Sequence, residues 1–150
     1  MFDFLWHLRG SVALRPTDTD QLVFDRLEML LDRQRKNTRM RTAELLTFEY
    51  PLFGDLFAPN WLAMIIYDAG RFWIDGNERE RVLRYDLRSL HGLVFCSVAA
   101  ALAFFFGLIS GGFLTAISLA AAAFTWLYGM NMLLAFARVP AAIRKAVISA

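Results

Sequence analysis

Residues 89–137 include no Asp, Glu, Lys or Arg, and this charge-free stretch constrains the fold more than any other feature of the chain. About 20 apolar residues let a helix cross the hydrocarbon core of a bilayer, so a stretch of 49 residues has room for two crossings. Gly111-Gly112 interrupts the apolar run near its middle, and such a pair is typical of a turn. We therefore predict a transmembrane helical hairpin over residues 91–137, with helices at about 91–110 and 113–137.

The charges that flank this stretch predict the orientation of the hairpin. The turn carries no charge, whereas basic residues precede the first helix and follow the second: Arg84, Arg88, Arg138, Arg144 and Lys145. By the positive-inside rule, both termini lie in the cytoplasm, and we expect a multi-pass protein of the bacterial inner membrane. Residues 138–150 contain no acidic residue, so we predict a basic cytoplasmic tail there. A buried hairpin in a soluble protein is disfavoured, because residues 1–90 are too few to cover both helices.

Small residues recur at a spacing of four along the first predicted helix. A tight turn at Gly111-Gly112 would place Gly107 beside Ala116 and Ala103 beside Ala120. Rows of small residues let helix backbones approach closely in lipid, although alanine is also common in membrane helices without such a role. The predicted packing residues are Ala99, Ala103, Gly107, Ala116 and Ala120.

Three other residues in the apolar stretch suggest specific contacts. His91 and Asn131 lie at about the same level, near the predicted cytoplasmic ends of the two helices, where a hydrogen bond between them would close the hairpin. Imidazole also binds metals, but the sequence places no further ligands nearby, so we predict no metal and no cofactor. Trp126 lies in the middle of its helix rather than at an interface. Contact with lipid is its default interpretation, and contact with a partner subunit or a pigment-like ligand is the alternative that makes it a candidate partner contact.

The first 90 residues predict a small α+β domain. Strand-like alternation and one amphipathic helical pattern occur in the order β-α-β-β-β-β. We therefore expect a small cytoplasmic α+β domain followed by a two-helix transmembrane hairpin. The predicted helix spans about residues 19–36, and the predicted strands span residues 11–15, 42–50, 60–67, 71–75 and 78–90.

Two parts of this domain are candidate interaction surfaces. Basic residues at and beyond the end of the predicted helix either complement its dipole or contact anionic lipid headgroups: Arg33, Arg35, Lys36, Arg39 and Arg41. An apolar segment between two prolines, residues 51–59, either covers the core of the domain or contacts the membrane interface or a partner. Its candidate contact residues are Phe53, Leu56 and Phe57.

The chain lacks the common catalytic motifs: Walker, GxGxxG, HExxH, GxSxG and CxxC. Two histidines and one cysteine give no evident nucleophile–base pair, and a mechanism using carboxylates alone is the remaining enzymatic alternative. The net charge of +2 is too small to indicate nucleic acid as a partner. We predict a non-enzymatic accessory or assembly subunit of a larger inner-membrane complex, in contact with lipids and other integral membrane subunits. The alternative is a homo-oligomeric channel, with Thr115, Ser118 and Thr125 lining a pore, or an anionic-lipid-binding module.

Overall fold

The computed structural model describes residues 6–36, 38–51, 64, 66–77 and 80–148. The described strands are β1 (His7–Ala13), β2 (Thr38–Arg41), β3 (Leu45–Glu49), β4 (Ala69–Asn77) and β5 (Glu80–Arg88). They form one antiparallel sheet in the order β1-β5-β4-β3-β2. The helices are α1 (Asp20–Arg33), α2 (Leu90–Gly111), α3 (Phe113–Phe124), the π-helical turn η2 (Thr125–Gly129) and α4 (Met130–Ile148). The predicted α+β class, with apolar helices following the sheet, is confirmed.

Helix α1 begins where its sequence predicts and ends at Arg33, three residues before the predicted end. The hydroxyl of Thr19 accepts a hydrogen bond from the backbone N–H of Leu22 at 3.3 Å, which satisfies one free donor of the first turn. Asp20 in the first turn and Arg33 in the last have the charges that a helix dipole favours. One apolar stripe is buried against the sheet and consists of Val23, Phe24, Leu27, Leu30 and Leu31.

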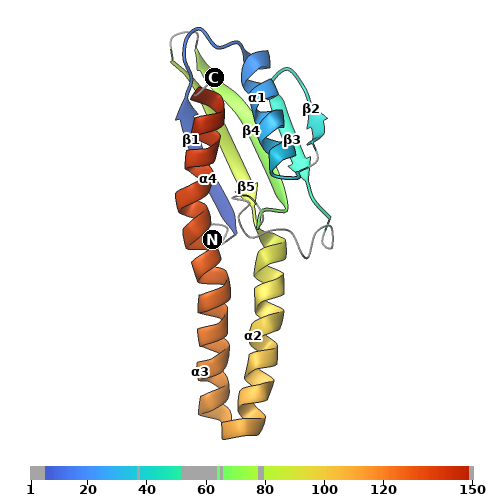
Figure 1. The fold of residues 1–150 in the computed structure, drawn as a ribbon, viewed down its shortest axis with the longest axis vertical. Coiled ribbons are helices and arrows are strands. Elements are labelled where there is room, and N and C mark those ends of the chain that lie inside the picture. Colours follow the sequence, from blue (N-terminus) through green and yellow to red (C-terminus); the bar gives the residue numbers. More distant parts are fainter. Residues whose placement is uncertain (1–5, 37, 52–63, 65, 78–79, 149–150) are drawn as a thin grey trace.

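The strands alternate between a buried face and an open face. In β5, Leu83, Tyr85 and Leu87 are buried, whereas the residues between them are exposed or half-buried. Gly10 of β1 lies opposite Tyr85, and a Cβ atom at Gly10 would lie 2.2 Å from the tyrosine oxygen. Because Gly10 has no side chain, the Tyr85 ring has room to pack against β1. Helices α1 and α4 lie on the same face of the sheet, and the core lies between them and the strands (Figure 1).

The apolar stretch forms the hairpin that the sequence predicts, with one difference. Helices α2 and α3 lie side by side and extend away from the sheet, with Gly112 between them at a φ of +80° (Figure 1). The second helix does not end at about residue 137. Instead α3, η2 and α4 form one helix of 36 residues, Phe113–Ile148, which runs back along the sheet.

Residues 138–148 are thus a helix in the core of the domain rather than a basic tail. Their spacing of four brings Val139, Ile143 and Val147 onto the face of α4 that packs on the sheet and α1, where all three are fully buried. Arg144 and Lys145 lie on the exposed side of the same helix. A guanidinium N–H of Arg26 in α1 donates to the carbonyl of Val147 at 2.7 Å and fastens the end of α4.

The predicted order of strands is found, but with different members. Strand β2 occupies residues 38–41, where the sequence predicts only a basic cluster. The prediction of a strand at residues 60–67 is wrong for the described part of that segment. Met64 and Ile66 lie in turns, and Tyr67 lies in no regular element. Met64 and Tyr67 are nonetheless fully buried, because a continuous apolar run indicates burial without specifying a strand. Residues 60–63 and 65 lie outside the described residues.

Candidate functional site

The two membrane-length helices approach closely at the predicted row of small residues. A Cβ atom on Gly107 would lie 2.6 Å from the Cα atom of Ala116, so only glycine permits this distance between the two backbones. Both residues are buried, and the other three residues of the row, Ala99, Ala103 and Ala120, are half-buried. The structure therefore brings this row to the contact between α2 and α3.

The rest of the hairpin surface is apolar and exposed. Both helices are long and apolar enough to cross a membrane, and their large side chains mostly point away from the contact between them. Trp126 is 69% exposed, the one tryptophan on this surface among the described residues. The remaining candidate partner contacts, Phe53, Leu56 and Phe57, lie outside the described residues.

A buried carboxylate joins the sheet to the first long helix. The Oδ1 atom of Asp68 accepts a hydrogen bond from the backbone N–H of His91 at 3.2 Å, in the first turn of α2. Its Oδ2 atom accepts from the Nε of Arg88 at 2.9 Å and lies 2.8 Å from the Nη2 of the same residue. Asp68 thus satisfies a free N–H of the helix and balances the charge of the last residue of β5.

Asp68, Arg88, Ser89 and the first turn of α2 form the junction between the sheet and the hairpin, which we call the joint. A second contact ties the helix Phe113–Ile148 to this joint. Ser89 is fully buried, and its Oγ lies 3.2 Å from the hydroxyl of Tyr128 in η2. The backbone N–H of Ser89 donates to the carbonyl of Trp6 at 2.7 Å. Met132 packs beside Tyr128 in a small cluster with Cys96 of α2. The joint therefore holds both long helices and the start of β1 together.

The hydrogen bond predicted between His91 and Asn131 is not formed. The amide of Asn131 donates instead to the carbonyl of Leu127, at 2.6 Å, one turn back in its own helix. That carbonyl belongs to the π-helical turn, where the regular ladder of helical hydrogen bonds is interrupted. Asn131 therefore supports this turn. His91 contributes to the joint through its backbone N–H, which donates to Asp68.

The predicted basic cluster is not one surface. Lys36 is buried, with its Nζ 4.4 Å from the ring centroid of Tyr50. Arg41 forms ion pairs with Asp25 at 2.6 Å and with Glu28, and these carboxylates raise the pKa of its guanidinium. Arg33 and Arg35 are exposed near the end of α1, and the side chain of Arg39 lies outside the described set. Two of the five cations therefore have local partners within the domain.

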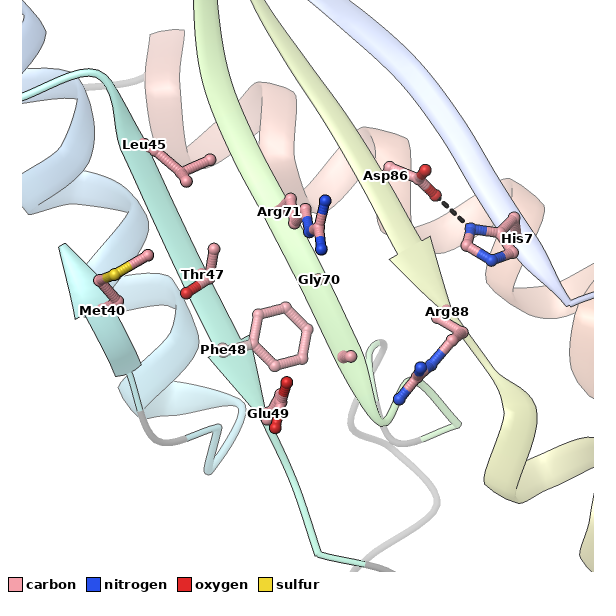
Figure 2. Close-up of a pocket in the computed structure, with 11 residues that line it drawn as sticks. His7, Met40, Leu45, Thr47, Phe48, Glu49, Gly70, Arg71, Asp86 and Arg88 are labelled. Atoms are coloured by element: carbon pink, nitrogen blue, oxygen red, sulfur yellow. Dashed lines mark hydrogen bonds and ion pairs between the residues drawn. The ribbon is translucent and has the colours of Figure 1, made fainter. Parts of the chain in front are cut away.

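The open face of the sheet contains a depression of about 740 Å³ that the sequence does not predict (Figure 2). His7 and Asp86 form a hydrogen bond at its side, with Nδ1 and Oδ1 2.5 Å apart, and the Nε of Arg9 lies 3.1 Å from the other oxygen of Asp86. Arg71 and Arg88 extend into it from β4 and β5. Strand pairing alone brings these residues together, because they lie up to 81 positions apart in sequence.

Two buried tyrosines have a raised pKa, and the shift is large for Tyr67. Burial raises the pKa of the Tyr85 hydroxyl, and burial together with the nearby hydroxyls of Tyr128 and Tyr85 raises that of Tyr67. The Tyr67 oxygen has no hydrogen-bond partner among the residues that the structure describes. Both groups stay neutral and serve the core. No cluster of three or more potential metal ligands occurs in the described part of the chain.

The residues of the joint were missed because their signals are weak in a sequence. Asp68 looks like part of an Asp-Ala-Gly turn, and Ser89 and Tyr128 look like ordinary residues at the ends of an apolar stretch. One signal was present: Asp68 is an acidic residue between two apolar segments, where burial requires a partner.

Comparison with protein-family models, with curated proteins and with solved structures finds no match for this chain.

Proposed function

We propose that this protein is a non-enzymatic accessory or assembly subunit of a larger complex in a bacterial inner membrane. In this proposal the hairpin spans the bilayer and docks against other integral membrane subunits. The domain stands on the membrane surface and presents its open sheet face to the surroundings.

The observation that carries the proposal is the helix shared by the hairpin and the domain. The helix Phe113–Ile148 pairs with α2 through Ala116 and enters the core of the domain through Val139 and Ile143. At about 1.5 Å per residue it is roughly 54 Å long, enough to cross a bilayer and continue along the sheet. A domain that shares a helix with its anchor keeps a fixed height and orientation, as a subunit that positions other proteins requires.

The distribution of charge supports an orientation with both termini in the cytoplasm. Arg88 and the basic residues of α4 lie at the domain end of the hairpin, whereas its tip at Gly111-Gly112 carries no charge. Alkaline phosphatase inserted at Gly112 should be active in a bacterial host, and the same enzyme fused to the C-terminus should be inactive. The reverse pattern would contradict this orientation.

Trp126 gives a sharp test of docking through the hairpin. After extraction in a mild detergent, the protein should migrate in a complex that contains a second, different membrane protein. Trp126→Ala should weaken this association, because exposed tryptophans contribute strongly to interfaces. Leu114→Ala, at an apolar site near the tip that is even more exposed than Trp126, is the matched control and should leave the complex intact.

Isolation of the chain only as a monomer or a homo-oligomer, in every mild detergent, would overturn the proposal. A homo-oligomer that conducts ions would support the channel alternative instead. The structure gives that alternative little support at Thr115, whose hydroxyl donates to the carbonyl of Gly111 at 3.0 Å within its own helix.

A further inference from the structure

We propose that the depression on the open sheet face binds the phosphate of an anionic phospholipid from the leaflet beside the domain, with Arg71 and Arg88 as its ligands. This inference rests on the part of the proposed function that inserts the hairpin into a membrane. It does not depend on a partner protein.

The site lies at the end of the sheet that joins the membrane hairpin. Arg88 ends β5 two residues before α2 begins. In the register of the sheet it lies opposite His7 at the start of β1 and opposite Ala69 at the start of β4. Arg71 is two residues further from the hairpin, opposite Asp86. Figure 2 shows the side chains of Arg71 and Arg88 on adjacent strands, with Gly70 between them. Gly70 itself belongs to the core face of the sheet, where a Cβ atom would lie 2.3 Å from the buried ring of Phe48.

The height of the site matches the headgroup layer. Strands rise about 3.3 Å per residue, so Arg88 lies about 7 Å and Arg71 at most about 13 Å from the first residue of α2. The headgroup layer on each side of the hydrocarbon core is about 5–8 Å thick. With α2 entering the hydrocarbon core at Leu90, Arg88 would lie at the level of lipid phosphates, and the long side chain of Arg71 could direct its guanidinium down to that level.

The charges of the site favour an anion at Arg71. The carboxylate of Asp86 already contacts His7 and Arg9, and the carboxylate of Asp68 forms an ion pair with Arg88. Glu49, the other carboxylate of the lining, also has a partner of its own. Arg71 is exposed and has no ion pair or hydrogen bond within the described ranges. A phosphate would supply the missing counter-charge, in the bidentate geometry that a guanidinium prefers.

Arg88 adds to this site without supplying a free charge. It uses Nε and Nη2 for Asp68, which leaves Nη1 as a donor, and its side chain is 41% exposed. The two guanidinium groups thus offer a phosphodiester several donors from two sides. The acyl chains of the lipid would then extend along the exposed apolar surface of α2, which includes Val94 and Phe95.

Lipid retention by the whole protein tests the site. The protein is reconstituted in nanodiscs of phosphatidylcholine and phosphatidylglycerol, extracted gently, and examined by native mass spectrometry for bound lipid. The wild type should retain phosphatidylglycerol in preference to phosphatidylcholine. Arg71→Gln should lower this retention about fivefold, the equivalent of about 1 kcal/mol, and Arg71→Lys should keep part of it.

Arg84→Gln is the matched control. Arg84 is a similarly exposed arginine, four residues nearer the start of β5 than Arg88, and it pairs with Asp75 rather than with the site. Its substitution should leave lipid retention unchanged. Equal losses in Arg71→Gln and Arg84→Gln, or no preference for phosphatidylglycerol in the wild type, would overturn the proposal.

Two further arms separate the alternatives. Millimolar inorganic phosphate should not displace the lipid from the wild type, and displacement would show that a soluble phosphate is the ligand and would overturn the lipid assignment. Extraction of native membranes with alkaline carbonate tests insertion independently of the site. A carbonate-resistant protein that retains phosphatidylglycerol but has no partner protein would refute the proposed function and leave this inference standing.

Discussion

The carboxylate of Asp68 accepts a hydrogen bond from the backbone N–H of His91, 3.2 Å away, so that the end of the sheet fixes the start of the first long helix. The same carboxylate pairs with Arg88, the last residue of β5. Only Ser89 separates Arg88 from α2, and it is fully buried. The direction in which the hairpin leaves the domain is therefore set by a few polar contacts at one place.

Substitution of Asp68 should destabilise this joint. Asp68→Ala leaves the His91 N–H and the Arg88 guanidinium without their acceptor, and we expect a loss of about 2–3 kcal/mol in the free energy of unfolding. Asp68→Asn keeps an acceptor for His91 and should cost less. Thermal unfolding in detergent, followed by circular dichroism, measures both variants.

Asp75 provides the matched control for this prediction. Its ion pair with Arg84 has a similar distance of 2.9 Å, but both side chains are 54% exposed. Asp75→Ala should therefore change the free energy of unfolding by less than about 0.5 kcal/mol. Equal losses at Asp68 and Asp75 would show that the joint has no special role.

Gly107→Ala should separate the two long helices. The new Cβ atom would lie 2.6 Å from the backbone of Ala116, and a backbone cannot move aside as a side chain can. We expect a loss of about 1–3 kcal/mol, because overpacking a tight contact forces a backbone shift. At Gly129 the nearest atom to a new Cβ is 3.8 Å away, so Gly129→Ala should cause no loss. A Gly107→Ala variant with the wild-type melting temperature would contradict the close contact.

How much of this architecture the sequence predicts depends on whether local composition is sufficient. The absence of charge and the Gly111-Gly112 pair predict the hairpin and its turn, because lipid requires only length and apolar composition. The stripe at Val23, Leu27 and Leu30 predicts α1 by its period.

The role of α4 is not predictable in this way. Arg138, Pro140 and Lys145 look like the start of a polar tail, and only the sheet makes Val139 and Ile143 core residues. The depression at Arg71 and Arg88 depends on the pairing of strands distant in sequence. Such pairing follows from the tertiary structure and is not encoded in any short motif.

Ile143→Ala tests whether α4 is part of the domain core. Ile143 is fully buried between the sheet and α1, so removal of three carbon atoms should cost about 2–5 kcal/mol. The neighbouring Arg144 is exposed, and Arg144→Ala should change the free energy of unfolding by less than about 0.5 kcal/mol. Hydrogen exchange offers a second measurement, since backbone amides of residues 139–148 should be protected as a core helix is. Rapid exchange throughout this segment would contradict its place in the core.

Tyr67 should make the protein sensitive to alkaline pH. Its hydroxyl is buried without a described partner, and its pKa is raised, so the folded state holds the proton longer than the unfolded state, which releases it near pH 10. Above about pH 10 the unfolded state therefore binds fewer protons, and the free energy of unfolding falls by up to about 1.4 kcal/mol per pH unit for this group.

Tyr67→Phe removes that titration and also the unpaired hydroxyl. At pH 7 the variant should be as stable as the wild type or up to about 1 kcal/mol more stable, because an unsatisfied buried hydroxyl is costly. Its melting temperature should fall less steeply between pH 9 and pH 11. Tyr85 also has a raised pKa, so part of the alkaline loss should remain. A Tyr67→Phe variant with an unchanged pH dependence would refute this origin of the effect.

The π-helical turn η2 should serve only to keep the buried faces before and after it aligned along the helix. In an uninterrupted α-helix, Ala116 and Tyr128 would differ by about 120° in direction, since each residue advances by about 100°. Both are nevertheless buried on the side facing α2 and the joint. One extra residue in the wider turn cancels about 100° of this difference and keeps the two faces aligned.

Deletion of Thr125, which is exposed in η2, should therefore convert the turn into regular α-helix and preserve both faces. We expect this variant to fold with a melting temperature close to that of the wild type. Deletion of exposed Ala137 in α4 is the matched control, because no wide turn lies between it and the core residues that follow. That deletion rotates Val139 and Ile143 by about 100° away from the sheet and should cost several kcal/mol or abolish folding. Equal damage from the two deletions would show that η2 has a role beyond register.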